Sequence, residues 1–244
     1  MNRSETVEDA LLTRRSCRAF QPTPVSRATI ERLLTLASRS ASNANCQPWQ
    51  VHVLTGAAKR ALTDDLLATY DTTGPAAGEY DYQPRQDEWP EPFRSRRRSF
   101  GEGLYRDALG IAPEDGEARR AHHRRNYDFF GAPVGLIVTV SAAPRQSALI
   151  DAGLFLQALM LAARGLGLHT CAQACFIDFA PVLRRHVVIS EDHLIVCALA
   201  VGHADEHHRL DAHRTTREPL GSFATFYASP STPDKGGSGP DTRY

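Results

Sequence analysis

The chain has 244 residues, of which 42% are hydrophobic and 23% are charged. These proportions are close to the globular average, so the chain can bury a core in one large domain or two small ones. Its 28 Lys and Arg residues equal its 28 Asp and Glu residues. This zero balance argues against a dedicated nucleic-acid-binding protein, which normally has a basic excess. No apolar run approaches the roughly 20 residues that span a bilayer, and the first residues lack a signal peptide, which favours a cytoplasmic location.

Two helices are predicted in the first 40 residues from their N-terminal caps. Thr6 precedes Val7 and Ala10 on one helical face, and this helix runs to an arginine-rich segment at residues 14–18. Ser26 precedes a second helix, whose apolar residues between positions 30 and 37 fall at i, i+3, i+4 and i+7. A polar stretch at residues 40–48 ends it. A strand at residues 49–54 and a helix at residues 57–70 follow.

Residues 71–128 differ from the rest because they are rich in Pro, Gly, Tyr, Asp and Arg and poor in aliphatic residues. Short helices are predicted at residues 93–109 and 114–127. So long a polar excursion is typical of a lid or an insertion. Arginines are interleaved with aromatic residues, which suits a lid over a flat, electron-poor or anionic aromatic substrate. The alternative is a solvated, salt-bridged segment that only caps the sheet. The aromatic residues are Tyr80, Tyr82, Trp89, Phe93, Phe100 and Tyr105.

Apolar elements return after residue 133. A strand is predicted at residues 134–140, and a helix at residues 147–166 is apolar on nearly every side, as expected of a helix buried centrally or in a subunit interface. A short strand or turn at residues 171–176 precedes a helix that Asp178 caps and that runs through Arg185. A strand at residues 194–201 comes last. The alternation predicts a layered α+β or α/β domain over residues 1–228, with a disordered tail at residues 229–244.

Two polar segments are candidates for ligand binding. Arg14-Arg15-Ser16-Cys17-Arg18 offers three guanidinium groups and a hydroxyl, a set that suits a phosphate. The alternative is a solvated helix end, where cations suit the helix dipole. The stretch at residues 40–49 carries many short amide and hydroxyl side chains that can bind the edge of a heteroaromatic ring. The alternative there is an ordinary Asn-rich turn before a strand.

Five segments together match one family pattern in order and spacing: residues 14–20, 40–49, 130–133, 165–173 and 214–220. Over roughly residues 6–227 the chain resembles the FMN-dependent nitroreductase family. Its Ala174-Cys175 pair, where many relatives have Glu-Gly or Gly-Gly, is similar to the nitrobenzoate-reductase-like subgroup. The resemblance implies an α+β, nitroreductase-like layered fold with a central mixed sheet flanked by helices. It also implies an obligate-type homodimer that holds FMN at its interface.

The resemblance also assigns roles to residues of this chain. Arg14, Ser16 and Arg217 correspond to the ligands of the FMN phosphate, with Arg214 as a helper. Arg18 corresponds to the cation at the flavin pyrimidine edge, where a fixed positive charge favours the reduced flavin. The loop at residues 42–47 corresponds to the loop that the partner subunit supplies, and residues 173–175 to the turn that reaches flavin N5. The full set assigned to FMN is Arg14, Arg15, Ser16, Arg18, Ser42, Asn43, Asn45, Gln47, Asn126, Gln173, Ala174, Cys175, Arg214 and Arg217.

The function implied is an oxidoreductase that uses NADH or NADPH to reduce nitroaromatics or quinones, by ping-pong hydride transfer through flavin N5. Two alternatives remain: a flavin-dependent dehydrogenase or oxidase acting on a natural product, and a flavin-binding or storage protein without turnover. No side chain is assigned a catalytic role and no metal site is predicted, because the Cys171-x3-Cys175 spacing does not match a zinc motif. The scattered cysteines are expected to be buried and inert, and the histidines from 203 to 213 to lie on the surface.

Overall fold

The computed structural model describes residues 3–76, 78–83 and 88–227. The chain divides into two compact units, Met1–Arg214 and Thr215–Tyr244. The single domain predicted over residues 1–228 stays a prediction. The tail predicted at residues 229–244 lies outside the described residues.

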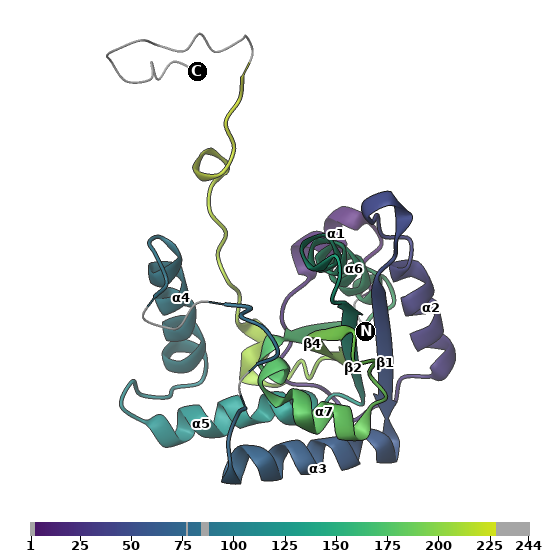
Figure 1. Cartoon of the computed structure of the whole chain (residues 1–244). Coiled ribbons are helices and arrows are strands. Elements are labelled where there is room, and N and C mark those ends of the chain that lie inside the picture. Colours follow the sequence, from purple (N-terminus) through teal and green to yellow (C-terminus); the bar gives the residue numbers. More distant parts are fainter. Residues whose placement is uncertain (1–2, 77, 84–87, 228–244) are drawn as a thin grey trace. The chain divides into compact units, whose positions relative to one another are not determined.

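A four-stranded sheet forms the centre of the first unit (Figure 1). Its strands are β1 (Trp49–Thr55), β2 (Val134–Ser141), β3 (His169–Gln173) and β4 (His193–Gly202), in the order β1-β2-β4-β3. All three pairings are antiparallel. The expected mixed sheet is thus reduced to a single parallel bridge, between Ser16 and Thr170. The chain runs beside β3 only there and then leaves to bridge Phe20 with Ala204, so no parallel strand develops.

Helices cover both faces of the sheet, because successive side chains of the central strands point to opposite sides. Leu136 of β2 and Leu199 of β4 pack with Phe155 of α6 (Arg145–Gly165) and with α2 (Arg27–Ala37). Ile137 and Ala198 point the other way, into a cluster with α3 (Gly56–Thr72) and α7 (Ala180–His186). This arrangement is the layered α+β fold that the sequence predicts.

The N-termini of three helices test the capping residues that the sequence predicts. The helix α1 (Val7–Thr13) begins with a capping box between Thr6 and Asp9, and Ser26 accepts a hydrogen bond from the backbone of Thr29 at the start of α2. Both predictions are confirmed. The prediction for Asp178 is wrong: the N-cap of α7 is Phe179, and the Asp178 carboxylate instead accepts a hydrogen bond from the Tyr82 hydroxyl.

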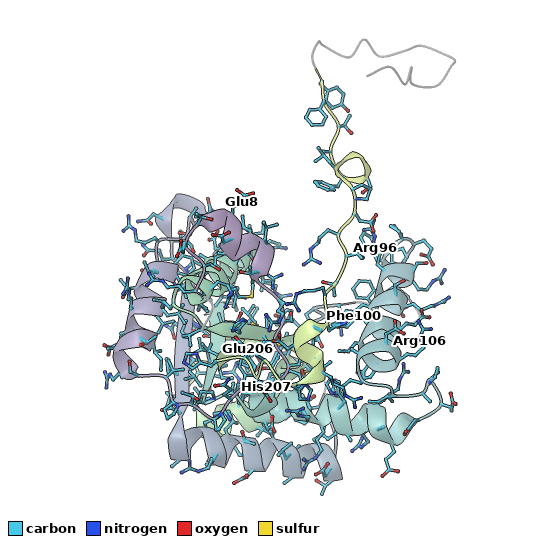
Figure 2. All side chains as sticks on the ribbon, turned by 180° about the vertical axis from the view of Figure 1, so that it is seen from behind. Glu8, Arg96, Phe100, Arg106, Glu206 and His207 are labelled. Atoms are coloured by element: carbon cyan, nitrogen blue, oxygen red, sulfur yellow. The ribbon has the colours of Figure 1, made fainter. Side chains whose placement is uncertain are left out.

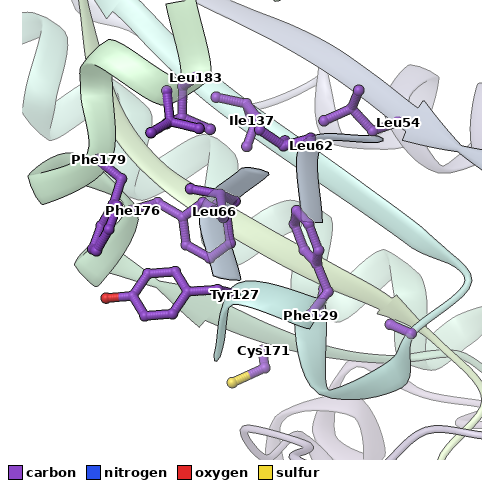
Figure 3. Packing of buried hydrophobic residues seen from close by; sticks show 14 of the residues in the cluster. Leu54, Leu62, Leu66, Tyr127, Phe129, Ile137, Cys171, Phe176, Phe179 and Leu183 are labelled. Carbon is purple, nitrogen blue, oxygen red and sulfur yellow. The ribbon is translucent and has the colours of Figure 1, made fainter. Parts of the chain in front are cut away.

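The polar region contains α4 (Phe93–Gly101), which continues as the π-helix η2 (Glu102–Ala108), and α5 (Gly116–Arg124). The short 3-10 helices of the chain are η1 (Asn43–Asn45), η3 (Arg125–Gly131), η4 (Ala174–Phe179), η5 (Arg209–Ala212) and η6 (Leu220–Ser222). Figure 3 shows Tyr127 and Phe129 of η3 projecting into the cluster with Phe176 and Leu66. Tyr127 is only 2% exposed, so the core begins before the boundary at residue 128 that the sequence predicts.

The long helix α6 is buried on one side of this chain only. Its Ile150 and Leu154 are 67% and 47% exposed, so the prediction that it is buried on all sides holds only if another chain covers that face. Among the described residues it alone is long and apolar enough to cross a membrane. It packs against α2, α1 and the sheet and buries both Asp151 and Arg164, as the core helix of a folded domain does. A cytoplasmic location stays a prediction from the sequence.

Gly135 gives a test of the packing between η3 and β2. A Cβ added there would lie 2.5 Å from the Phe129 ring, and Phe129 is fully buried. We expect Gly135→Ala to lower the free energy of unfolding by about 1–3 kcal/mol, measured by urea titration. Gly101→Ala is the control, because no atom lies within 4 Å of its added Cβ; in a helix it should be neutral or stabilising. Equal stability of the two variants would contradict this packing.

Candidate functional site

A buried arginine fixes the arginine-rich segment that follows α1. Arg164, near the C-terminus of α6, is 4% exposed. Its Nε donates to Thr13 Oγ1 at 3.3 Å and its Nη1 donates to the Leu168 carbonyl at 3.1 Å. Four residues after Thr13, the Cys17 N–H donates to the Thr170 carbonyl at 2.9 Å. These bonds hold residues 14–18 in extended backbone beside the start of β3.

Positive charge gathers at this end of β3. Arg15 forms an ion pair with Asp211, and Arg214 donates to the Asp211 carbonyl. Burial is the main cause of the lowered pKa of Arg15, and the charge of Arg214 adds to it. Burial, followed by the charges of Arg164 and Arg15, lowers the pKa of His169 to about 3, so His169 is neutral. Repulsion among these groups means that an anion bound here would be stabilised.

Arg18 belongs to a second positive region. Its Nη1 donates to the Ser16 carbonyl at 3.3 Å, and its guanidinium carbon lies 5.4 Å from the centre of the Phe100 ring. Figure 2 shows Phe100 on the side of α4 that faces the body of the unit, whereas Arg106 points away from it. Burial lowers the pKa of His122 to about 4, and the charges of Arg125 and Arg18 add to this effect. Arg18 is thus a cation whose neighbour His122 is neutral.

At the far end of β3, the structure brings together two further residues that the sequence assigns to FMN. Gln173 Nε2 donates to the Asn126 carbonyl at 2.6 Å, and Asn126 Nδ2 donates to the His123 carbonyl at 2.8 Å. Gln173 is 2% exposed. Its Oε1 is buried and accepts no hydrogen bond from any residue that the structure describes. An unsatisfied buried acceptor is costly, and a ligand with an N–H or O–H group would satisfy it.

The next two residues of this turn have different environments. Ala174 is exposed and opens η4. Cys175 is half-buried, packs against the main core cluster and interacts with the Tyr127 hydroxyl. Burial raises the pKa of Cys175 to about 12, so its thiol is protonated and unreactive. The expectation of buried cysteines also holds for Cys17, Cys171 and Cys197 but is wrong for Cys46, which lies in the exposed loop after α2.

Hydrogen bonds hold that loop in place although most of its residues are exposed. The backbone N–H of Asn43 lies 3.1 and 3.2 Å from the two carboxylate oxygens of Asp151, which is buried in α6. Ser42 Oγ accepts from the N–H of Gln47 at 3.1 Å, and Gln47 Nε2 donates to the Asn45 carbonyl. Ala44, Asn45 and Gln47 all have positive φ. A strained backbone of this kind persists only where surrounding contacts fix its conformation, and it is common at ligand sites.

The loop lies far from the positive cluster of its own chain. Asp151, which anchors the loop, and Arg164, which anchors the cluster, are both in α6. At 1.5 Å per residue, they are about 20 Å apart along the helix. One chain therefore brings residues 14–18 together with Arg214, and Asn126 together with Gln173, but not the 42–47 loop. Arg217 belongs to the second unit, where its Nη1 donates to Thr215 and Thr216.

The sequence analysis missed Arg164 and His169. Arg164 directly precedes the 165–173 segment, and its signal is weak because almost all the cations of this chain are arginine. His169 lies inside that segment, but the family pattern assigns it no role. Among the described residues there is no group of three or more side chains that could hold a metal ion.

Comparisons with known proteins agree on one family. The model of the nitroreductase family matches residues 11–203. A 4-nitrobenzoate reductase of Nocardioides sp. (strain LMS-CY) is 52% identical over 87% of this chain and 86% of its own length. The crystal structure of the FMN- and NADPH-dependent nitroreductase NfnB from Sphigopyxis sp. strain HMH has a TM-score of 0.86, with 34% identity over 92% of this chain and all of that one. NfnB from Mycobacterium smegmatis, in complex with NADPH, has a TM-score of 0.84, with 28% identity over 91% of this chain and 98% of that one.

The buried neutral His169 predicts an acid-sensitive fold. Its pKa in the folded state is about 3, whereas an unfolded histidine titrates near 6.5. Between these values only the unfolded chain binds the proton, so stability falls as the pH drops below about 6.5, by up to roughly 1.4 kcal/mol per pH unit. We expect His169→Gln to lose less stability than the unchanged chain between about pH 6.5 and pH 4.5 in urea titrations. The exposed His207 provides the control, His207→Gln, and an unaltered slope in His169→Gln would refute the assignment.

Proposed function

This chain belongs to the nitroreductase family, and from that premise we propose that it is an enzyme that uses NAD(P)H and FMN to reduce nitroaromatic compounds or quinones. The observation that carries the proposal is the arrangement along β3. The positive cluster lies at His169 and the unsatisfied Gln173 Oε1 lies at the other end of the strand. These ends are about 13 Å apart at the usual rise of a strand, which suits a long cofactor with an anionic end and a polar ring.

The described residues fit FMN. A phosphate carries nearly two negative charges. Arg15 and Arg214 meet at Asp211 near the start of β3, and Arg14 precedes them in the chain, so this group of cations suits a phosphate. Ser16 is exposed beside them and adds a hydroxyl donor. Gln173 and Asn126 offer amide groups to a ring edge. Arg217 remains a proposed phosphate ligand from the second unit.

The chemistry itself belongs to the cofactor: when bound, FMN would accept hydride from the nicotinamide at N5 and return two electrons to the acceptor in a ping-pong cycle. The protein supplies position and charge. Arg18 is held by the Ser16 carbonyl and by Phe100, so its positive charge is fixed where the pyrimidine edge is proposed to lie, and it would stabilise negative charge there. No nucleophile is needed, in keeping with the protonated thiol of Cys175.

We also propose that the active form is a homodimer. Five large apolar side chains on α1 and α6 are exposed: Val7, Leu11, Leu12, Ile150 and Leu154. The two helices pack against each other, and an apolar surface of this kind is typical of a subunit interface. The 42–47 loop is anchored at Asp151, beside Ile150. An interface on this face would therefore present the loop to the partner's site, which its own chain leaves about 20 Å away.

The activity is tested with purified protein, NADPH or NADH, and a nitroarene. The proposal requires a yellow protein that oxidises the nicotinamide only when the nitroarene is present. A protein that keeps its flavin but catalyses no nicotinamide oxidation would instead be a flavin-binding protein without turnover. Oxidation of an added natural product by the flavin, without nicotinamide, would favour a dehydrogenase or oxidase.

The phosphate assignment predicts a loss of cofactor in Arg14→Ala. Each lost charge-assisted hydrogen bond costs about 1.5–3 kcal/mol, so we expect most of the FMN to be released on dialysis, measured by the ratio of flavin to protein absorbance. Arg27→Ala is the matched control, because Arg27 is almost fully exposed and pairs with Glu31 in the same helix. If Arg14→Ala stays fully yellow, the phosphate lies elsewhere.

The interface assignment predicts that Leu11→Asp gives a monomer with reduced FMN content, since flavin binding and dimerisation are then linked. Sedimentation velocity gives the assembly state, and flavin absorbance in the same run gives the loading. Val188→Asp serves as the control: Val188 is 95% exposed and lies after α7, away from α1 and α6. A Leu11→Asp protein that remains dimeric would exclude this interface. A monomer that retains all its FMN would support the interface but refute the contribution of the partner's 42–47 loop to flavin binding.

A further inference from the structure

Two contacts of the Arg18 guanidinium differ in strength. Its Nη1 donates to the Ser16 carbonyl at 3.3 Å, which is longer than the usual distance of about 2.9–3.0 Å for such bonds. Its guanidinium carbon lies 5.4 Å from the centre of the Phe100 ring, within the range of a cation–π contact. An unrestrained arginine side chain occupies many rotamers. Phe100 is therefore the stronger restraint on where the charge of Arg18 lies.

The Phe100 ring is itself supported by His213. The two rings meet edge to face, with their centroids 6.4 Å apart. A Cβ added at Gly103, three residues after Phe100 in the same continuous helix, would lie 3.5 Å from Cε1 of His213. The backbone of η2 thus lies against the same histidine. Nε2 of His213 is buried and has no hydrogen-bond partner among the residues that the structure describes, so packing against Phe100 and Gly103 holds this side of the ring.

A small apolar cluster fixes the same part of the insertion to η5. Leu104 of η2 is buried with Leu210 of η5. The next residue of η5 is Asp211, which forms the ion pair with Arg15. The stretch of the insertion at residues 100–104 therefore adjoins both groups of cations, the one around Arg15 through η5 and Arg18 directly.

These contacts give the insertion a role that differs from a lid over the substrate and from a cap on the sheet. A lid needs contacts with the substrate, and a cap needs contacts with the strands. Residues 100–104 instead contact a cation and a helix that belong to the candidate cofactor site. A positive charge beside a flavin ring stabilises the negative charge of the reduced flavin. It does so best when it is already in place, because no reordering is then needed as the flavin is reduced.

We propose that Phe100 is a positioning residue for the cofactor: it holds the Arg18 guanidinium beside the flavin ring and so raises the reduction potential of bound FMN. The inference rests on the proposed function, in which Arg18 lies at the pyrimidine edge. Phe100 acts through Arg18 and needs no contact with the flavin or with the acceptor. The insertion is then a part of the cofactor site.

The test measures the midpoint potential of bound FMN in the holoenzyme, by spectroscopic titration against a reference dye. In Phe100→Leu we expect the preference for reduced over oxidised FMN to fall by about 3- to 10-fold, the range of one cation–π contact. The potential should therefore fall by about 14–30 mV, since a tenfold change equals about 30 mV for two electrons. Phe100→Tyr keeps the ring and should restore the potential. Phe93→Leu is the matched control, because Phe93 of α4 makes the same kind of contact with Arg96 at 5.8 Å, away from the residues assigned to FMN.

A double-mutant cycle shows whether Phe100 acts through Arg18. Arg18→Gln should lower the potential at least as much as Phe100→Leu, and the double variant should lower it no further than Arg18→Gln alone. The titration follows the flavin that elutes with the protein, so a variant that loses part of its FMN still gives a potential. Additive shifts, an unchanged potential in Phe100→Leu, or an equal shift in Phe93→Leu would overturn the proposal.

Failure of the proposed function has a different signature. If the unchanged protein binds FMN but its reduced flavin is not reoxidised by any nitroarene or quinone, the proposed function is refuted, whereas the potentials of the variants still report on Phe100. If it binds no FMN, both are refuted. If it binds FMN and reduces a nitroarene while Phe100→Leu leaves the potential unchanged, only the role of Phe100 is refuted.

Discussion

The buried guanidinium of Arg164 is the interaction on which the candidate site depends. It joins Thr13 at the end of α1, the Leu168 carbonyl before β3 and the His169 ring. A buried arginine is stable only when its donors are satisfied, and here the partners are the elements that define the site. Satisfying Arg164 therefore fixes where α1 ends and where residues 14–18 run. The positive charge at the start of β3 follows from this arrangement.

The strand β3 separates two groups of polar side chains that differ in chemistry. Cations gather at His169, and amide groups with an unsatisfied acceptor lie at Gln173. The parallel bridge from Ser16 to Thr170 places the hydroxyl of Ser16 along the same line. The insertion borders this region, because Phe100 of α4 lies against the Arg18 guanidinium. In the proposed function, the anion site and the ring site therefore lie at opposite ends of β3.

Much of the fold could be predicted because its signals are local. The caps at Thr6 and Ser26 and the apolar runs of β2 and β4 depend only on neighbouring residues. Asp178 was misassigned because a tertiary partner, Tyr82, competes for its carboxylate. Tyr127 was placed in the insertion because the polar residues around it hide the left-handed turn at Phe129 and Phe130 that directs η3 into the core. The exposed face of α6 could not be distinguished from a buried one, since leucine and isoleucine serve equally in a core and in a subunit interface.

The candidate site was predictable where a family pattern exists and not where contacts are long-range. Residues 14–18 and Gln173 are assigned roles by matched segments, whereas the parts played by Arg164 and by His169, which lies in a matched segment without an assigned role, follow only from their hydrogen bonds. The four arginines of α4 cannot be told apart by sequence, because they differ in which aromatic ring or carboxylate each one contacts.

The central claim is that the cofactor lies along β3, with its phosphate at the His169 end. A crystal structure of the purified protein with FMN tests this most directly. The account predicts phosphate density against Arg14, Ser16 and Arg214, the flavin ring beside Gln173, and the 42–47 loop of a second subunit against the same flavin. A phosphate bound at the Gln173 end, or a flavin enclosed by the 42–47 loop of its own chain, would contradict it.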